Sequence, residues 1–425
     1  MGSEADAARA VRDVATAAAE AGAVLRTVPA ERVAAMLRAA AGLVTARSEE
    51  ILAANADDVE RATVNGMSAG LLDRLRLDPA RLEQAAHALV QVAETPVPPA
   101  LTHVRDLDDG THVWERRLPV GVIGATYEAR PAVTLDVAGQ VLRAGSAAVL
   151  RTGSAALGTS AVLVDRVLVP ALADAGLPPT AVGLVRHPGH DSAEALVSQP
   201  ELLPLVIVRG SGDTTRHLAH LGAAAGVRVL AHADGGGILY ADLAADRSTL
   251  QRLIEQGTDR LGVCNRLNLL LVHRERWDEL RPVIEKALSD KGIAVSAPPH
   301  DHPLGWEWAL DSEREATVTI APVEDALDAV RTGLASTSGI AATVCTEDRA
   351  TAATFLGAWG GTGGFWNTTT RLLDGYKLLG VPETGISVDR VPGPRGPVTS
   401  SDLVLRQFVV VPAGQDVPLI TEPGP

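Results

Sequence analysis

Cys264 is the residue in this sequence whose type and surroundings best suit covalent chemistry. It is one of two cysteines in 425 residues and stands in the stretch GVCN, which a single arginine separates from the apolar run LNLLLVH. A cysteine reacts as its thiolate, which requires access and a positive local field, and Arg260 and Arg266 are close in sequence. The residues alone leave two interpretations open: a catalytic nucleophile, or a small buried hydrophobic side chain. Cys345, within AATVC, is expected in a core strand.

Two other stretches carry groups that bind anions. YEARP (127–131) follows a predicted strand, and its Arg130 either clamps a carboxylate or phosphate or pairs with Glu128 of the same motif. VIVRGSGDTTRHL (206–218) has the pattern of a strand, a glycine turn and a helix, whose first N–H groups suit a phosphate. It lacks the full G-x-G-x-x-G pattern, so a plain strand-to-helix turn explains it equally well.

The stretch HADGGGILY (232–240) has three consecutive glycines. Such a chain either passes flat beneath a planar ligand or serves as a flexible connection. The histidines form no metal-binding spacing with the cysteines, and we predict no metal. The histidines considered are His187, His190, His232, His300 and His302.

The surrounding pattern predicts two α/β lobes. Residues 1 to about 100 have helical periodicity, with Asp78 and Pro79 as a helix start, and TPVPPA (95–100) breaks the pattern. Strands and helices then alternate as far as residue 240, and a second alternating series begins near residue 247, as in parallel doubly wound sheets. Two lobes in series imply a cleft between them, and Cys264 lies near the start of the second lobe.

Composition excludes several classes of protein. With 425 residues and 46% apolar residues the chain can bury two or three domain cores, and its net charge of −14 argues against a nucleic-acid scaffold. The N-terminus lacks signal-peptide features, and no apolar run is long enough to span a membrane. Two cysteines cannot form a disulfide framework, so a reducing cytoplasm is expected. The β-prone stretch SDLVLRQFVVVPAG (401–414) needs a sheet edge, either in its own chain or in a partner.

Taken together and in order, these stretches resemble the gamma-glutamyl phosphate reductase (glutamate-5-semialdehyde dehydrogenase) family of the aldehyde dehydrogenase superfamily. The stretch PVGVIGATYEARPAVTLDVAGQVLRAGSAAVLRTGS (119–154) is the most specific. The other matching pieces are ILAANADDVERA (51–62), LLDRLRLDPARL (71–82), HADG (232–235), RLGVCN (260–265), LLLVH (269–273) and NTTTRLLDG (367–375).

The resemblance implies an aldehyde dehydrogenase-like α/β fold with three parts. A Rossmann-type nucleotide-binding domain would comprise residues 1–104 and 122–240, and an α/β catalytic domain with Cys264 would comprise residues 241–390. Residues 105–121 and 391–425 would form a small β oligomerisation flap, in which the hairpin pairs with the C-terminal strand of a neighbouring subunit. A homo-oligomer is therefore expected.

The resemblance also implies a mechanism. The Cys264 thiolate attacks an acyl phosphate, and the resulting thioester is reduced by NADPH to an aldehyde; NAD is not excluded as the cofactor. An amino-acid kinase would supply the acyl phosphate. The substrate-binding residues that it implies are Glu128, Arg130, Asn265, Asn367, Thr370 and Arg371. The cofactor-binding residues that it implies are Arg151, Thr152, Gly153, Ser154, Arg209, Gly210, Ser211, Gly212, His232, Asp234, Gly235 and Gly236.

The chain departs from the family pattern at several of these sites. Gly237 and Ile238 stand where the family has Cys-His, Ile340 stands where it has a histidine, and Ala309 stands where the superfamily has a ribose-binding glutamate. Asp213 replaces a glycine and would bring negative charge near a cofactor phosphate. The other departures are Gly257, Asp259, Leu261, Asn268 and Leu269.

Because polar site groups discriminate strongly between substrates, three functions stay open. The chain is a gamma-glutamyl phosphate reductase of proline synthesis, or a paralogue that reduces a different acyl phosphate or acyl thioester, or a weakly active homologue that binds a nucleotide or partner.

Overall fold

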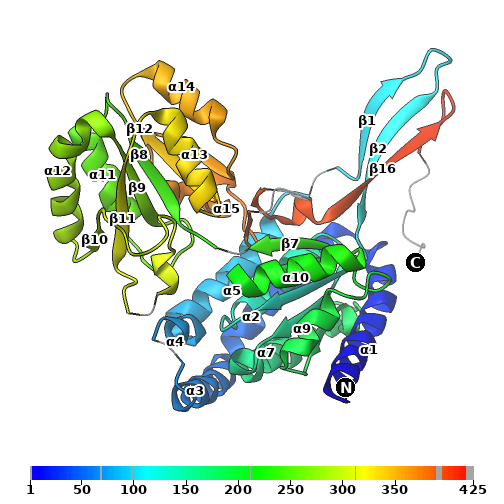
Figure 1. The fold of residues 1–425 in the computed structure, drawn as a ribbon. Helices are drawn as coiled ribbons and strands as arrows, with labels where there is room; N and C mark the ends of the chain where they lie inside the picture. The colour runs from blue at the N-terminus through cyan, green and yellow to red at the C-terminus, as the bar shows by residue number, and fades with distance from the viewer. Residues whose placement is uncertain are drawn as a thin grey trace.

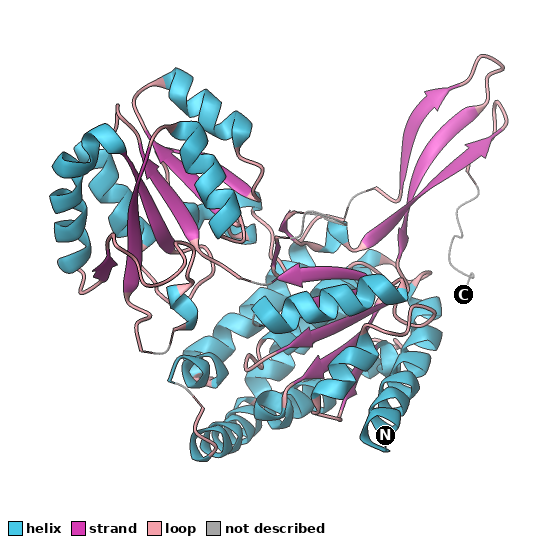
Figure 2. Cartoon of the chain, in the orientation of Figure 1, coloured by secondary structure: helices cyan, strands magenta, loops and turns pink. Residues whose placement is uncertain are grey.

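The first lobe is a five-stranded parallel sheet with helices on both faces (Figures 1 and 2). The structure, a computed structural model, describes residues 2–67, 69–97, 99–210, 212–232, 234–311, 313–388 and 395–417. The strands lie in the order β5-β4-β3-β6-β7. Their bounds are β3 Val122–Tyr127, β4 Ala147–Thr152, β5 Val182–Val185, β6 Leu205–Arg209 and β7 Arg228–His232.

The helices of this lobe include the one whose start was predicted from Asp78 and Pro79. Asp78 caps α5 by accepting a hydrogen bond from the Arg81 N–H at 2.7 Å, and Pro79 occupies the first turn, as predicted. The first five helices are α1 Gly2–Leu25, α2 Ala30–Ala46, α3 Ser48–Val64, α4 Ala69–Leu75 and α5 Pro79–Glu94. Those between or after the strands are α6 Val133–Arg143, α7 Leu157–Leu163, α8 Val169–Asp174, α9 His190–Leu196 and α10 Gly212–Ala225.

One helical stretch, Ser154–Asp174, is long and apolar enough by composition to cross a membrane. It comprises α7, a π-helical segment Val164–Leu168 and α8, with a short 3-10 turn before them. Half of its most apolar part is buried inside the protein. Leu163, Val167 and Leu172 belong to the core of the first lobe. A core helix of a globular domain has this same character.

The second lobe is a six-stranded parallel sheet in the order β10-β11-β9-β8-β12-β13. Its core has two layers, because alternate residues of β8, such as Ile238 and Leu239, face opposite sides of the sheet. The strands are β8 Gly237–Ala241, β9 Leu267–His273, β10 Ala294–Ser296, β11 Thr317–Val323, β12 Ala341–Cys345 and β13 Gly363–Trp366. The helices are α11 Arg247–Gly257, α12 Trp277–Ser289, α13 Ala326–Ser336, α14 Arg349–Ala358 and α15 Gly375–Leu379.

A three-stranded antiparallel flap projects from the first lobe, on the side away from the second lobe (Figure 1). It consists of β1 Leu101–Asp106, β2 His112–Pro119 and β16 Val404–Val411, with β2 in the centre. The resemblance placed the hairpin against the C-terminal strand of a neighbour. In the structure β16 pairs with β2 of its own chain, from Val404 opposite Pro119 to Val411 opposite His112. The backbone N–H and C=O groups on this edge of β2 therefore pair with a strand of the same chain.

The lobe boundaries differ slightly from the expected ones. β1 begins at Leu101 rather than at residue 105. The first lobe ends with β7 at His232, because Gly237 of β8 already pairs with Leu267 of the second sheet. The chain then returns to the first lobe near β14 (Ile386–Ser387), where the Val388 N–H donates to the Ala231 carbonyl at 3.4 Å.

Candidate active site between the lobes

The first lobe presents a ligand-binding edge where its strand order reverses. β3 lies between β4, which follows it along the chain, and β6, which comes after β5. In open parallel sheets, ligands bind at the carboxyl ends of the strands beside such a reversal. These ends carry Glu128 and Arg130 after β3, Arg209 at the end of β6 and His232 at the end of β7. The topology therefore brings together four residues from three separate stretches.

The second lobe faces this edge with the amino ends of its strands. Cys264 stands three residues before β9, and the loop before β8 packs directly against it. The Gly236 N–H donates to the Cys264 carbonyl at 2.7 Å, and the Gly237 N–H donates to the Arg266 carbonyl at 2.6 Å. The connection from β7 to β8 therefore holds the Cys264 turn between the lobes.

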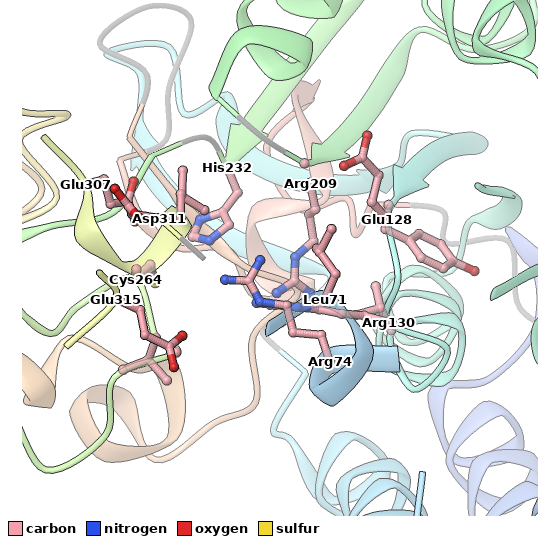
Figure 3. Close-up of a pocket in the computed structure, with 17 residues that line it drawn as sticks. Leu71, Arg74, Glu128, Arg130, Arg209, His232, Cys264, Glu307, Asp311 and Glu315 are labelled. Carbon is pink, nitrogen blue, oxygen red and sulfur yellow. The ribbon is translucent and has the colours of Figure 1, made fainter. Parts of the chain in front are cut away.

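A cavity of about 290 Å³ lies between the lobes, with Cys264 in its wall (Figure 3). The thiol is free and partly exposed. The first lobe lines the cavity with Leu71, Arg74, Tyr127, Glu128, Arg130, Val133, Arg209, Gly210 and His232. The second lobe lines it with Gly262, Val263, Cys264, Glu307, Ala309, Leu310, Asp311 and Glu315.

Three guanidinium groups converge in this cavity: Arg74, Arg130 and Arg209 (Figure 3). Burial lowers the pKa of Arg130 to about 10, and the positive charges of Arg209 and Arg74 contribute to that lowering. Within the described part of the chain, none of the three forms an ion pair. Clustered, half-buried cations without a carboxylate partner are costly for the protein alone. Such a cluster is typical of an anion-binding site.

The Cys264 thiol is protonated at neutral pH in this structure. Burial raises its pKa to about 11, and the negative charges of Glu383 and Glu307 contribute to the rise. Arg130 and Arg209 act in the opposite direction. Part of the desolvation comes from an apolar cluster of Ile340, Leu373 and Ile386, against which Cys264 packs. The sequence analysis expected this positive field from Arg260 and Arg266, but the cations that favour the thiolate are Arg130 and Arg209. The Arg266 guanidinium donates instead to the carbonyls of Glu315 and Thr317.

His232 presents a neutral imidazole to the cavity. Its Nδ1 lies 2.5 Å from the carbonyl oxygen of Ile386, so Nδ1 must donate, and Nε2 keeps its lone pair. Burial lowers the pKa of His232 to about 4, and Arg209 contributes. The ring is thus a hydrogen-bond acceptor in the cavity and carries no charge at neutral pH.

Glu307 brings a carboxyl group to the cavity two residues before Ala309. Ala309 lines the cavity without a polar group, but Glu307, two residues earlier, accepts a hydrogen bond from the Gly235 N–H at 2.7 Å. Burial raises the pKa of this carboxyl to about 7. A carboxyl group is therefore present beside Cys264, supplied by a different position.

Four of the predicted substrate-binding residues lie outside the cavity lining. Asn265 is buried, its Nδ2 donates to the Leu373 carbonyl at 2.8 Å, and its Oδ1 accepts from Arg371. The Nε of Arg371 also donates to Asp259 Oδ1 at 2.6 Å. Thr370 Oγ1 donates to the Asn265 carbonyl at 2.8 Å. These three therefore support the turn that carries Cys264.

Asn367 contacts a different loop. It has a left-handed backbone with φ of 47°, and its Oδ1 accepts from the Thr346 N–H at 3.0 Å. It therefore fixes the end of β12. Contact of these four residues with substrate stays a prediction.

The predicted cofactor residues at the end of β4 and just after it have different environments. Arg151 is buried and donates to Ser192 and to the carbonyls of Pro188 and Gly189, so its guanidinium is used internally. Thr152 is buried with a hydroxyl that has no partner among the described residues. Beyond it, a Cβ at Gly153 would meet nothing within 4 Å, and Ser154 is exposed.

The residues around the start of α10 pack closely. A Cβ at Gly212 would overlap the carboxylate of Asp234, so a larger residue there would require the Asp234 side chain to move. Asp234 pairs with Arg216 at 2.5 Å, and the side chain of Asp213, 98% exposed, pairs with the same arginine at 2.7 Å. Arg216 thus offsets the charge of Asp213, which lies outside the cavity lining. Ser211 falls outside the described residues.

The departures at Gly237, Ile238 and Asn268 have structural reasons. A Cβ at Gly237 would lie 2.7 Å from the Arg266 carbonyl oxygen, and Ile238 is a buried core residue. Asn268 is buried and bridges Trp306 and Trp308 through its amide, at 2.8 and 3.1 Å. These positions shape the second lobe rather than the cavity wall.

Sequence reasoning missed several residues of the cavity. Arg74 and Leu71 lie in the LLDRL stretch that the resemblance quoted only as a family marker, about 190 residues before Cys264. Asp311 and Glu315 follow Ala309 in a loop. No spacing rule links these residues to Cys264, but the unusual polarity of LLDRLRL could have indicated a role for Arg74.

A thiol held between two parallel α/β lobes, opposite the switch point of a nucleotide-type sheet, is the arrangement of the aldehyde dehydrogenases. The family model of the aldehyde dehydrogenase family matches residues 2–299, and the chain belongs to this family. The chain is 36% identical over 398 residues to a gamma-glutamyl phosphate reductase of Thermus thermophilus, covering 89% of this chain and 93% of that protein.

Solved structures agree with this assignment. The crystal structure of gamma-glutamyl phosphate reductase from Thermotoga maritima has a TM-score of 0.86 and 27% identity, and covers 96% of this chain and 100% of its own. An engineered glycolyl-CoA reductase with bound NADP⁺ shares the fold, with a TM-score of 0.71 and 16% identity over 94% of this chain and 96% of its own. The predicted fold class and family resemblance are confirmed.

Proposed function

We propose that this chain reduces gamma-glutamyl phosphate to glutamate-5-semialdehyde, the reductase step of proline synthesis, through a thioester at Cys264. The observation that carries the proposal is the placement of a free thiol in the wall of one cavity with Arg74, Arg130 and Arg209. An acyl phosphate is an anion with an electrophilic carbon, so its chemistry requires a nucleophile beside clustered cations. The relative from Thermus thermophilus carries the name of this activity.

In the proposed reaction the Cys264 thiol first loses its proton to solvent, and the resulting thiolate attacks the acyl carbon. The bond from that carbon to the phosphate oxygen breaks, and phosphate leaves with the electron pair, held by the arginines. The backbone N–H of Cys264 has no partner among the described residues, so it is free to stabilise the oxyanion. After reduction, the carbon–sulfur bond breaks, the thiolate returns and the aldehyde leaves.

The residues at the first lobe fit a nicotinamide nucleotide, which supplies hydride chemistry when bound. Thr152 and Thr215 carry buried hydroxyls without partners in the described part of the chain, near the carboxyl ends of β4 and β6. A Cβ at Gly153 would meet nothing within 4 Å, so the backbone beside Thr152 is open, whereas a Cβ at Gly210 would lie 3.5 Å from Thr215 Oγ1. Unpaired buried hydroxyls next to open backbone are typical of a ligand site.

The engineered reductase that shares the fold was solved with NADP⁺, and we propose NADP as the cofactor. NAD is the alternative, because the guanidinium of Arg151, a candidate for binding a 2′-phosphate, is used internally.

A second candidate function rests on one position. Ile340, where the resembled family has a histidine, belongs to the apolar cluster against which Cys264 packs. Loss of a polar group beside the nucleophile changes which acyl chain fits. The alternative is therefore a paralogue that reduces a different acyl phosphate or acyl thioester.

The test is the reverse reaction. Purified protein, phosphate and pyrroline-5-carboxylate, which is in equilibrium with the semialdehyde, should reduce NADP⁺, and Cys264→Ser should abolish this activity. Activity only on another aldehyde would favour the paralogue. Absence of binding of either nicotinamide nucleotide in calorimetry would overturn both and leave the non-catalytic homologue. Turnover that survives Cys264→Ser would rule out the thioester.

The setting of this activity is also proposed. An amino-acid kinase would supply the labile acyl phosphate, and the protein would work in the cytoplasm. The flap supports a homo-oligomer. Its strand β16 exposes three large apolar side chains, those of Leu405, Phe408 and Val410. Large apolar side chains on an exposed strand are typical of an association surface.

A further inference from the structure

A cluster of three metal-ligating side chains lies in the flap, remote in the fold from the cavity. His103, Asp106 and His112 each direct one ligand atom to a common point, and these atoms all lie within 4.8 Å of one another. Asp106 Oδ1 is 2.8 Å from His103 Nε2 and 2.5 Å from His112 Nδ1. Nothing in the proposed reaction uses these residues.

The backbone of the hairpin creates this cluster. Asp106 and His112 are direct cross-strand partners of β1 and β2, which puts both side chains on one face. His103 is three residues before Asp106, and in a regular strand that odd spacing would put it on the opposite face. The register shifts between His103 and Arg105, and this bulge returns His103 to the face of Asp106.

The turn and a neighbouring ring hold the cluster in place. The Leu107 N–H donates to the Thr111 carbonyl at 2.8 Å, and Gly110 adopts a φ of 82°, which closes the hairpin in one register. The His103 ring stands edge-on to Trp114 at 5.1 Å between centroids. The imidazole orientations are therefore constrained before any ion binds, which reduces the entropic cost of binding.

We propose that His103, Asp106 and His112 form a binding site for a divalent transition-metal ion of the Zn²⁺ type. Two imidazole nitrogens and one carboxylate oxygen are ligands that Zn²⁺ prefers, at about 2.0–2.2 Å. Tetrahedral binding at such distances separates the ligand atoms by about 3.4 Å, which small side-chain rotations reach from the present spacing. Three protein ligands leave one position for water or for a group of a second molecule.

Among the residues that the structure describes, no second group of three such ligands is found, and smaller contacts serve as controls. His217 pairs with Glu194 alone, at 2.9 Å on the surface of the first lobe. His302 contacts Ser296 at 2.6 Å, with His300 beside it and no carboxylate bonded to the pair in the described residues. Cys264 is another strong zinc ligand. Metal bound to its thiolate would show a charge-transfer band, which metal bound in the flap would not.

The experiment uses tag-free, chelator-treated protein and measures Zn²⁺ binding by calorimetry and Co²⁺ binding by absorption. We expect Zn²⁺ to bind at the flap in the wild type. His112→Ala and His103→Gln, both still folded by circular dichroism, should weaken that binding by at least about tenfold. His217→Ala and His302→Ala should leave it unchanged, and Co²⁺ should show d–d bands without a thiolate charge-transfer band. Undiminished binding in both flap variants, no binding in the wild type, or a thiolate band that disappears in Cys264→Ser would overturn the proposal.

Discussion

The backbone of Gly235 lies directly against that of Cys264. A Cβ built on Gly235 would lie 2.6 Å from Cys264 Cα and 2.5 Å from its carbonyl oxygen, and 2.6 Å from Glu307 Oε1. These separations are far below van der Waals contact, so only glycine allows the loop between the lobes to support the nucleophile. The position of the thiol in the cavity thus depends on a residue 29 positions earlier.

Gly235→Ala should therefore displace the Cys264 turn and lower kcat of the reverse reaction by at least about a hundredfold, as expected for a misplacement of about 1 Å. The matched control is Gly262→Ala. Gly262 also lines the cavity beside Cys264, but its Cβ would meet nothing within 4 Å. Equal losses in both variants, measured with NADP⁺ reduction at saturating phosphate, would contradict the role of the close contact.

Alkylation of Cys264 should depend steeply on pH. Because its pKa is raised to about 11, its thiolate fraction and its rate with iodoacetamide should rise about tenfold per pH unit from pH 7 to 9. Cys345, fully buried and with its pKa raised to about 12, should stay unmodified in the same mass spectra.

Neighbouring charges should shift this rate in opposite directions. Glu383 is negatively charged above its pKa of about 7 and disfavours the thiolate, so Glu383→Gln should lower the pKa of Cys264. Arg130 favours the thiolate, so Arg130→Gln should raise that pKa. A shift of one unit would change the alkylation rate at pH 8 by about tenfold, faster for the first variant and slower for the second. Shifts of the same sign would refute this account of the electrostatics.

Arg74 is expected to bind the anionic part of the substrate. Arg74→Gln removes one charged donor from the three-arginine cluster, which should raise KM for phosphate in the reverse reaction by about ten- to a hundredfold. Arg76→Gln, two residues later on an exposed side chain, should change KM by less than about twofold. A raised KM in both variants would point to long-range charge rather than contact.

Asp58 is expected to be important for stability. It is fully buried in α3, accepts hydrogen bonds from Thr159 N at 2.7 Å and Thr159 Oγ1 at 2.6 Å, and pairs with Arg61. Asp58→Ala leaves these donors unpaired and should lower the free energy of unfolding by about 2–4 kcal/mol in urea denaturation. Asp57→Ala, at the exposed neighbouring position, should change it by less than about 0.5 kcal/mol.

Phe408 tests the proposed association through the flap. Its ring is 54% exposed, on the face of β16 that carries Arg406. Phe408→Asp should shift the sedimentation coefficient toward that of a monomer, because a charge would be buried in the interface. Leu379 in α15 is also 54% exposed, and Leu379→Asp should leave the oligomer intact. A wild-type protein that sediments as a monomer would remove the basis for this proposal.

The sequence predicted features that depend on local pattern. The alternation of strands and helices indicated two parallel lobes, and Asp78 with Pro79 marked a helix start that the structure contains. It singled out Cys264, Arg130, Arg209 and His232, which all line one cavity. The predictions of the lobes and of the helix start succeeded because periodicity, capping and strand-to-helix turns are properties of short segments.

Other features depended on contacts between distant segments. Arg74 and Glu307 reach the cavity from segments with no sequence link to Cys264, and Asn265 turned out to face Arg371 rather than the cavity. The β-bulge after His103 joined three flap residues that no spacing rule connects, and β16 paired within its own chain. Such relations are fixed by strand register and lobe packing, which sequence spacing does not encode.

The sequence by itself therefore determined the two-lobe architecture, the candidate nucleophile and the family resemblance, because these follow from periodicity and from residue types in short motifs. Only the tertiary structure decided which side chains surround the thiol and what ionisation state they impose. The physical reason is that burial and electrostatic interaction depend on distance in space, and the two lobes bring together residues that are as much as 190 positions apart, as Arg74 and Cys264 are.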